Sequence, residues 1–275
     1  MAENAWTVTG PQTIDVDGVS SLKLGIVRGR FDIVTHDEDV ARIEVSEIHG
    51  DPLSVSLVNG RLEVRHQLHG AQGWFKNLMG TVNNSSSNSV VVSIALPAGA
   101  EVEAGTVSGD GMVAGVSGRI RLNTVSGSVL ADETSGDLAV NTVSGEVIAR
   151  NHHGVLTARS VSGEVTASGE FTNIRANTVS GELNFDLHGF TQDFGSNSVS
   201  GDVTIRLPHD VGVDIIAKSA TGAVVIDDQQ YAQPGGSVQT IAGPDAKLML
   251  VRTNTVSGKT SIFHGRPAAD AETGL

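Results

Sequence analysis

Short alternations of apolar and polar residues, separated by glycine, run through most of this chain. A Thr/Ser-Val-Ser-Gly phrase recurs, and its first four intervals are 18 residues long, followed by intervals of 20, 21 and 36 residues. The glycines of this main series are Gly109, Gly127, Gly145, Gly163, Gly181, Gly201, the weaker copy Gly222, and Gly258. Since 36 is twice 18, we expect a degenerate copy around Ile241-Ala242-Gly243. A fixed period of this kind is typical of repeat architectures.

Each repeat consists of two halves with the alternation of a half-buried strand. Residues two and four after the main glycine are apolar, as at Leu183 and Phe185, and so are residues two before it. These positions are predicted to point inward, including the valines before the glycine, which are Val107, Val125, Val143, Val161, Val179, Val199 and Val256. The second half repeats the pattern with Ile120, Leu138, Leu156 and Ile174, then Leu122, Val140, Ala158, Ala176 and Phe194.

A nine-residue half accommodates a strand of about five residues and a corner, but no crossover helix. Glycine at the corner would supply backbone angles that a Cβ forbids. The predicted fold is therefore all-β, a β-solenoid of stacked turns of about 18 residues with two short strands in each turn. Like residues would then stack about 4.8 Å apart.

Polar residues also recur in columns. Asparagine stands four residues before the main glycine in several repeats, and amides stacked in this way can form a hydrogen-bonded ladder. The members of this column are Asn123, Asn141, Asn177, Asn197 and Asn254, with Arg159 and Lys218 interrupting it. Threonine or serine stands three residues before the glycine, and its hydroxyl is expected to bond corner backbone groups rather than act as a nucleophile.

The pattern predicts three regions. Residues 1–100 form a less regular, β-rich N-terminal cap with an irregular loop at 70–89; residues 101–263 form the solenoid; residues 264–275 form a disordered tail. The segments 27–33 and 58–64 repeat the apolar spacing around a glycine, but they lie about 31 residues apart. Longer turns and antiparallel neighbours are expected there, and the cap would cover an open edge of the stack.

Composition narrows the possible functions. The 275 residues include no cysteine, which excludes disulfides and thiolate chemistry. The formal net charge of -13 argues against nucleic-acid binding, which requires a basic patch. The first residues lack the features of a signal peptide, and no apolar window is long enough to span a bilayer. The expected location is the cytoplasm.

The tandem phrase Asn-Thr-Val-Ser-Gly-Glu-Val, as at residues 141–147, resembles the bacterial candidate-adhesin family of β-strand repeats. The resemblance covers most of the chain and is strongest over 101–263. It implies a β-solenoid fold and unknown function, in a family whose members often accompany envelope-stress or membrane-associated regulatory proteins. It supplies no catalytic residue.

Four acidic residues follow the main glycine in consecutive repeats: Glu146, Glu164, Glu182 and Asp202. Stacked like charges repel, so solvent either screens them or a cation or a basic partner relieves them. One interpretation is solubility and protection against lateral aggregation. The alternatives are an acidic docking stripe for a protein, weak calcium binding, or the carboxylates of a carbohydrate-active β-helix enzyme.

Histidines give no clear site. His66 and His69, and His152 and His153, occur only as pairs, whereas zinc needs three or four converging ligands. Solvated corner residues are the expected interpretation, and no metal or cofactor is predicted.

The loop at 70–89 contains Trp74, Phe75, Leu78 and Met79, which would share one face of a short helix. They would form either a lid over the open end of the solenoid or an anchor for a partner or a membrane surface.

Taken together, the sequence predicts a non-enzymatic scaffold or protein-interaction protein with a protein partner that the sequence does not identify. A monomer or weak homo-oligomer is expected. The alternatives to the scaffold function are a self-assembling, end-to-end solenoid and the carbohydrate-active enzyme.

Overall fold

The computed structural model describes residues 4–66, 88–231 and 236–265, which form strands, turns and bends. The all-β prediction is confirmed for these residues. The described part of the chain contains no helix with the length and apolar character needed to cross a membrane. The chain divides into two compact units, Met1–Ile148 and Ala149–Leu275, and the strand β14 (Val147–Ser160) contains the boundary. The predicted boundary at residue 100 lies inside the first unit.

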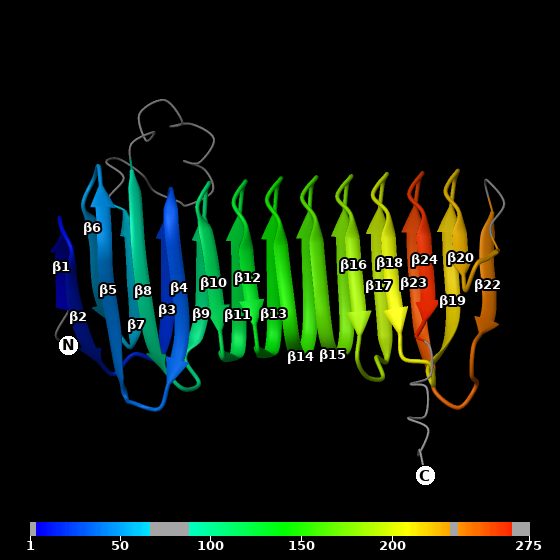
Figure 1. Ribbon diagram of the computed structural model, residues 1–275, viewed down its shortest axis with the longest axis horizontal. Coiled ribbons are helices and arrows are strands. Elements are labelled where there is room, and N and C mark those ends of the chain that lie inside the picture. The colour runs from blue at the N-terminus through cyan, green and yellow to red at the C-terminus, as the bar shows by residue number, and fades with distance from the viewer. Residues whose placement is uncertain (1–3, 67–87, 232–235, 266–275) are drawn as a thin grey trace, which may run out of the picture. The chain divides into compact units, whose positions relative to one another are not determined.

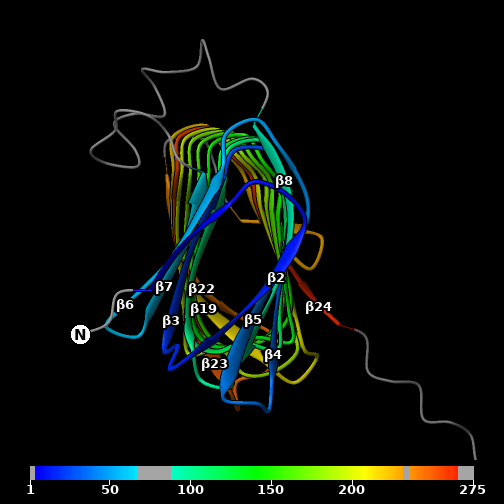
Figure 2. The ribbon, with the colours of Figure 1, turned by 90° about the vertical axis from the view of Figure 1, so that its left-hand side faces the viewer.

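In the N-terminal unit the strands form two facing walls (Figure 1 and Figure 2). The first wall consists of β1 (Asn4–Val8), β6 (Leu53–Val58), β7 (Arg61–His66), β3 (Ser21–Ile26), β9 (Glu101–Thr106), β11 (Ser117–Thr124) and β13 (Ser135–Thr142), in spatial order. The second wall consists of β2 (Gln12–Asp17), β5 (Val40–His49), β8 (Ser89–Pro97), β4 (Gly29–His36), β10 (Asp110–Ala114) and β12 (Val129–Asp132).

The outer strands of this unit are antiparallel and the inner strands are parallel. Antiparallel pairs join β1 to β6, β6 to β7, β2 to β5 and β5 to β8, as expected for the N-terminal region. In the parallel part, Leu122 of β11 lies level with Val140 of β13, its counterpart in the next repeat. The strands β3 and β4 come early in the chain but lie inside the stack. On one wall β3 lies between β7 and β9, and on the other wall β4 lies between β8 and β10.

The C-terminal unit also has two walls. One consists of the second half of β15 (Val165–Thr178), β17 (Asp193–Ser198), β23 (Leu248–Thr255), β19 (Gly212–Ser219) and β22 (Ser237–Ala242). The other consists of the first half of β15, β16 (Leu183–Leu187), β18 (Val203–Leu207), β24 (Thr260–His264), β20 (Val224–Ile226) and β21 (Gln229–Gln230).

Here too the spatial order differs from the chain order. The turn formed by β23 and β24 lies between the turn of β17 and β18 and the turn of β19 and β20. The segment around Ile241-Ala242-Gly243 is not a degenerate copy of the repeat, because β22 pairs antiparallel with β19. The long last interval of the glycine series therefore contains an edge strand instead of a skipped turn.

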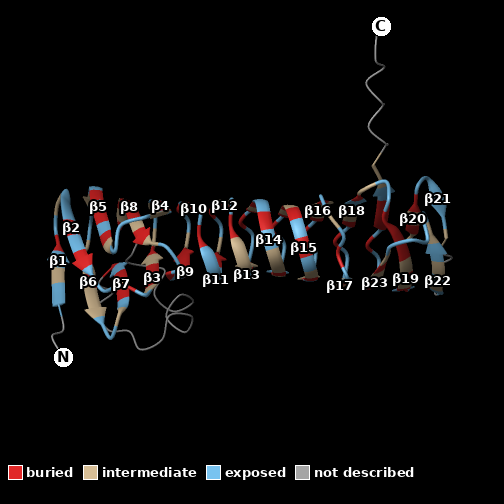
Figure 3. Cartoon of the chain, turned by 90° about the horizontal axis from the view of Figure 1, so that it is seen from below, coloured by how far each residue is buried: buried red, intermediate tan, exposed pale blue. Residues whose placement is uncertain are grey.

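The space between the walls is filled by the predicted apolar columns, whose alternation of buried and exposed residues is visible along the strands in Figure 3. Leu183 is fully buried, and the rings of Phe185 and Phe194 meet edge to face with their centroids 5.1 Å apart. Phe194 lies level with Ile174, not with Ala176 as predicted, because this repeat is longer than the four before it. Each such side chain contributes about 1.5–3 kcal/mol when buried.

The column of valines before the main glycine is exposed, so the prediction that it points inward is wrong. The exposed fractions are 41% for Val143, 47% for Val161, 48% for Val179, 47% for Val199 and 52% for Val256. Val107 and Val125 are half-buried.

Candidate functional site: the corner rim

At every glycine of the main series except Gly222, the hydroxyl three residues earlier bonds the backbone of that glycine. At Gly222 the corresponding Ser219 Oγ is buried without a hydrogen-bond partner among the described residues. Gly181 N donates to Thr178 Oγ1 at 2.8 Å, and Ser198 Oγ donates to Gly201 O at 2.6 Å. Thr178 and Ser198 are buried. Local bonds of this kind are typical of Ser and Thr in turns, and they confirm that this column serves the corner structure.

The main glycines are needed because neighbouring corners approach closely. A Cβ on Gly181 would lie 2.0 Å from Gly163 O, and a Cβ on Gly201 would lie 2.1 Å from Gly181 O. Neither glycine has a positive φ, so the predicted reason, special backbone angles, is wrong for this series. It holds for the second corner, where Gly118 and Gly136 have φ of 112° and 103°.

The hydroxyl points inward, and three side chains of each Val-Ser-Gly corner in the C-terminal unit are exposed: the valine, the serine and the residue after the glycine. We call these exposed side chains the corner rim. In the C-terminal unit the rim comprises Val161, Ser162, Glu164, Val179, Ser180, Glu182, Val199, Ser200, Asp202, Val256, Ser257 and Lys259.

Hydrogen bonds between corners hold the rim in place. Ser180 Oγ donates to Val161 O at 3.3 Å, and Ser200 Oγ donates to Val179 O at 3.4 Å. The corresponding backbone N–H groups of Ser180 and Ser200 donate to the same two oxygens at 2.8 Å. The valine side chains therefore stand on a backbone that is fixed by its neighbours, and the serines have a structural partner.

The predicted acidic column is part of this rim. Glu164, Glu182 and Asp202 are exposed in the C-terminal unit, and Glu146 is exposed in the N-terminal unit. Glu164 Oε1 accepts hydrogen bonds from Asn184 Nδ2 at 3.1 Å and from Thr166 Oγ1 at 3.2 Å.

Asp202 and Glu146 also have local partners. Asp202 Oδ1 accepts a hydrogen bond from Lys259 N at 2.8 Å, and Glu146 Oε2 lies 3.5 Å from the hydroxyl of Ser128. Because Lys259 follows Asp202 in the stack, a cation ends the acidic series of the C-terminal unit.

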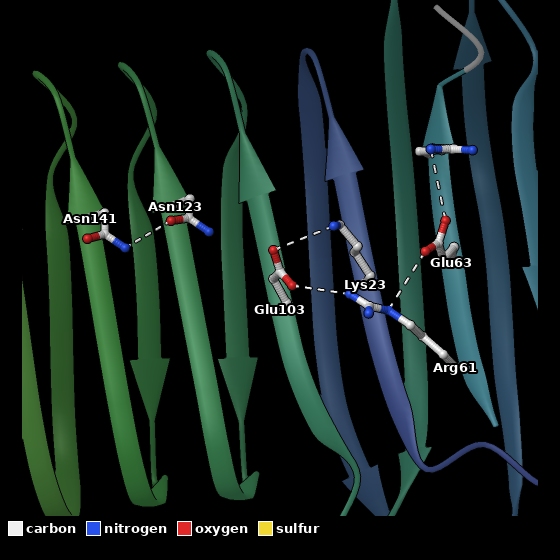
Figure 4. A network of polar contacts seen from close by, with 7 residues as sticks. Lys23, Arg61, Glu63, Glu103, Asn123 and Asn141 are labelled. Atoms are coloured by element: carbon white, nitrogen blue, oxygen red, sulfur yellow. Dashed lines mark hydrogen bonds and ion pairs between the residues drawn. The ribbon is translucent and has the colours of Figure 1, made fainter. Parts of the chain in front are cut away.

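The asparagine ladder is confirmed within each unit. Asn141 Nδ2 donates to Asn123 Oδ1 at 3.0 Å in the N-terminal unit (Figure 4). In the C-terminal unit, Asn197 donates to Asn177 at 2.7 Å and Asn254 donates to Asn197 at 3.0 Å.

Next to the ladder of the N-terminal unit, a small ionic network crosses β3, β7 and β9 (Figure 4). Glu103 lies 3.8 Å from Lys23 Nζ and 3.4 Å from Arg61 Nη2, and Arg61 Nε lies 3.7 Å from Glu63. The partly exposed side chains make this network a minor contributor to stability.

Two of the histidines differ from the prediction. His66 and His152 are buried, with exposed fractions of 4% and 0%, and are not solvated corner residues. Gly25 of β3 pairs with Arg65 of β7, so the next residue, His66, continues the register to the level of Ile26, which pairs with Thr106. This places His66 in the column of corner hydroxyls. Burial lowers the pKa of His66 below 6.5, while the nearby Asp51 carboxylate acts in the opposite direction.

The remaining predicted residues, Trp74, Phe75, Leu78, Met79 and His69, lie outside the described residues. Within residues 4–66, 88–231 and 236–265, no group of three or more His, Asp or Glu side chains is arranged to hold a metal ion.

The parallel stacked walls and hydroxyl-closed corners define an all-β, solenoid-like repeat protein whose exposed feature is a rim of repeated side chains. The chain belongs to the Toastrack family, DUF4097, whose family model matches residues 23–262. This is a family of domains of unknown function, which confirms the resemblance stated from the sequence.

Solved structures of low sequence identity share the fold. A candidate lipid binding protein from Parabacteroides distasonis is 15% identical, with a TM-score of 0.55, over 94% of this chain and 97% of its own. A candidate adhesin from the same organism is 9% identical, with a TM-score of 0.54, over 96% of this chain and 97% of its own. No protein with a curated description matches the sequence.

Proposed function

We propose that this protein is a non-enzymatic interaction scaffold, a β-solenoid of short stacked turns with a β-rich N-terminal cap, that binds a protein partner through the corner rim. The observation that carries the proposal is the exposed valine series, in which Val161, Val179 and Val199 are each nearly half exposed. An apolar side chain gains no stability by lying in solvent, and a repeated apolar series favours an interaction surface.

The neighbouring groups indicate what kind of partner would fit. The acidic residues Glu164, Glu182 and Asp202 lie three residues after the valines and are exposed on the same corners. A partner segment with apolar and basic side chains would bury the valines and neutralise the carboxylates. The rigid backbone of the rim reduces the entropy lost on binding.

The proposed location is the bacterial cytoplasm, at the inner face of the membrane through envelope-associated regulatory proteins. The loop at 70–89, with Trp74, Phe75, Leu78 and Met79, is proposed as a second contact, with a partner or with the membrane surface. The name of the P. distasonis candidate lipid binding protein supports testing a lipid surface. Flotation with anionic liposomes that is lost when residues 71–89 are replaced by a Gly/Ser linker would support the membrane contact, and no flotation of the intact chain would contradict the membrane contact.

The rim is tested by site-specific photo-crosslinking in the bacterium that encodes the protein. A photoreactive residue at Val179 should give a discrete adduct, whereas the same residue at the exposed Thr172, which lies outside the corner rim, should not. The adduct should disappear when Val161→Ser and Val199→Ser are added, because these changes remove apolar area without affecting the core. Equal adducts from both positions, or an adduct unaffected by the serine changes, would contradict the proposal.

A control separates loss of binding from loss of structure. Thermal unfolding of the variant with Val161→Ser and Val199→Ser should match that of the unmodified chain to within about 0.5 kcal/mol, because substitutions at exposed positions rarely change stability more. The variant Thr166→Ser with Thr204→Ser changes the same number of side chains on the wall of β15 and β18 and should leave the adduct intact.

A further inference from the structure

The strand β22 is the outermost strand of its wall. Its residues pair antiparallel with β19, from Ser237 opposite Lys218 to Ala242 opposite Val213. Of the strands in the described residues, only β19 pairs with β22. Along its outer side, the N–H and C=O groups therefore have no strand partner in the described chain, and such an edge is a template for another strand.

β22 also lacks the features that usually protect an edge. Its sequence, Ser-Val-Gln-Thr-Ile-Ala, contains no charged residue and no proline. Val238 and Ile241 favour a β-strand, and Ile241 is 59% exposed, the highest value among the exposed large apolar residues of the described chain. Uncharged segments of about six residues with high β-propensity pair readily when exposed.

Two of the other outer strands, β2 and β21, carry such protection. β2 contains Asp15 and Asp17, and Asp15 forms an ion pair with Arg42 at 2.9 Å. β21 has only two residues and follows directly after Asp227 and Asp228. Short length and charge both discourage pairing between edges. Of the remaining edges in the described chain, only the five-residue β1 is also uncharged.

We propose that β22 is a self-association site, at which β22 of a second copy of this chain adds in antiparallel orientation about a twofold axis. The absence of charged residues in β22 supports a second copy as the occupant, because two β22 strands can pair without placing any charges opposite one another. With the axis at Thr240, Val238 lies opposite Ala242 and Ile241 lies opposite Gln239; with the axis at Gln239, Ile241 lies opposite Ser237. Closed twofold dimers are also the commonest assemblies of identical chains.

The net charge of the chain opposes this association. The formal net charge of -13 makes two copies repel, and added salt screens that repulsion. Dimerisation through an uncharged edge should therefore strengthen as salt rises, whereas binding of a basic partner at the acidic rim should weaken. The two surfaces are thus distinguishable, and the proposal for β22 does not depend on the function proposed for the rim.

Cysteine crosslinking tests the geometry, because the natural chain contains no cysteine. Residues that face themselves across a twofold axis between antiparallel strands are close enough for a disulfide. Gln239→Cys or Thr240→Cys should give a disulfide-linked dimer under mild oxidation, well above the background of Thr172→Cys. Absence of that dimer would overturn the proposal. So would crosslinking only in a mixture of Thr240→Cys with Ala5→Cys, because β22 would then pair with β1 of the next copy.

Sedimentation tests the energetics in the unmodified chain. The sedimentation coefficient should rise with protein concentration, and more steeply at high salt. Gln239→Lys with Ile241→Lys, both at exposed positions, should abolish the rise, whereas Val179→Lys with Val199→Lys on the rim should not. Circular dichroism confirms that the variants fold. A concentration-independent monomer, or a dimer that survives both lysines in β22, would overturn the proposal.

Discussion

Valine occurs both in the interior columns and in the corner rim, but it is buried in the columns and exposed on the rim. Val165, inside the C-terminal unit, is 1% exposed, whereas Val161, four residues earlier in the same corner, is 47% exposed. Both recur with the repeat, so recurrence alone does not distinguish a core position from a surface position. The distinction comes from the corner, where two consecutive residues, Val161 and Ser162, both face outward.

The largest effect should come from placing a charge on either side of this corner. Leu183→Asp buries an unpaired carboxylate and should cost more than about 4 kcal/mol, enough to unfold the domain. Val179→Asp, four residues earlier, should change the free energy of unfolding by about 0.5 kcal/mol or less. Urea titration of both variants measures the difference. Similar losses would show that the valine series is part of the core after all.

A smaller effect should follow from adding a methyl group at the corner. Gly181→Ala places its Cβ against Gly163 O, where the available distance is 2.0 Å, and should cost about 2–3 kcal/mol as the stack is forced apart. The matched change Gly189→Ala meets Glu170 Cγ at 3.5 Å, an ordinary contact. Thermal unfolding should separate the two variants. If Gly181→Ala were as stable as Gly189→Ala, close stacking would not be the reason for the glycine.

The smallest effect concerns the one histidine in the column of corner hydroxyls within the described residues. Because burial lowers the pKa of His66, the unfolded chain binds the proton more tightly than the folded chain. The contribution of neutral His66 is fully present above about pH 6.5 and is lost as the pH falls from there through the folded-state pKa. The slope is at most about 1.4 kcal/mol per pH unit.

His66→Leu should therefore flatten the dependence of the melting temperature on pH between about 7 and 5. The exposed His49→Leu, in the same unit, is the control. An unchanged pH profile in His66→Leu would show that protonation of His66 does not affect folding.

Much of the fold could be predicted from the regular period of the Val-Ser-Gly phrase. The columns that contain Leu183, Phe185 and Ile174 are buried as expected, and the asparagine ladder forms, because stacking in register makes one repeat predict the next. The valines before the glycine differ from the prediction because the prediction carries the alternation through the corner without a shift. Ile174 and Ala176 already pointed to Thr178, and not Val179, as the next inward residue.

The order of the strands at each end could not be read from the period. The partner of a strand depends on which strand edge is still unpaired when that strand folds. The local sequence contains no signal that identifies this partner. The candidate surfaces divide in the same way: the acidic residues were identified from their spacing, whereas the exposed valines and the bare edge of β22 emerge only from the structure.

The position of β23 and β24 has a consequence for folding during synthesis on the ribosome. β19 ends at Ser219 and β23 begins only at Leu248, so β19 and β20 are synthesised well before the strands that join them to the rest of the C-terminal unit. Apolar residues of β19 and β20, such as Ile215 and Ile226, therefore remain uncovered until β23 and β24 have been synthesised. β23 and β24 then insert between this pair and the pair β17 and β18. A growing chain of this kind would need protection from aggregation until its last turn has left the exit tunnel.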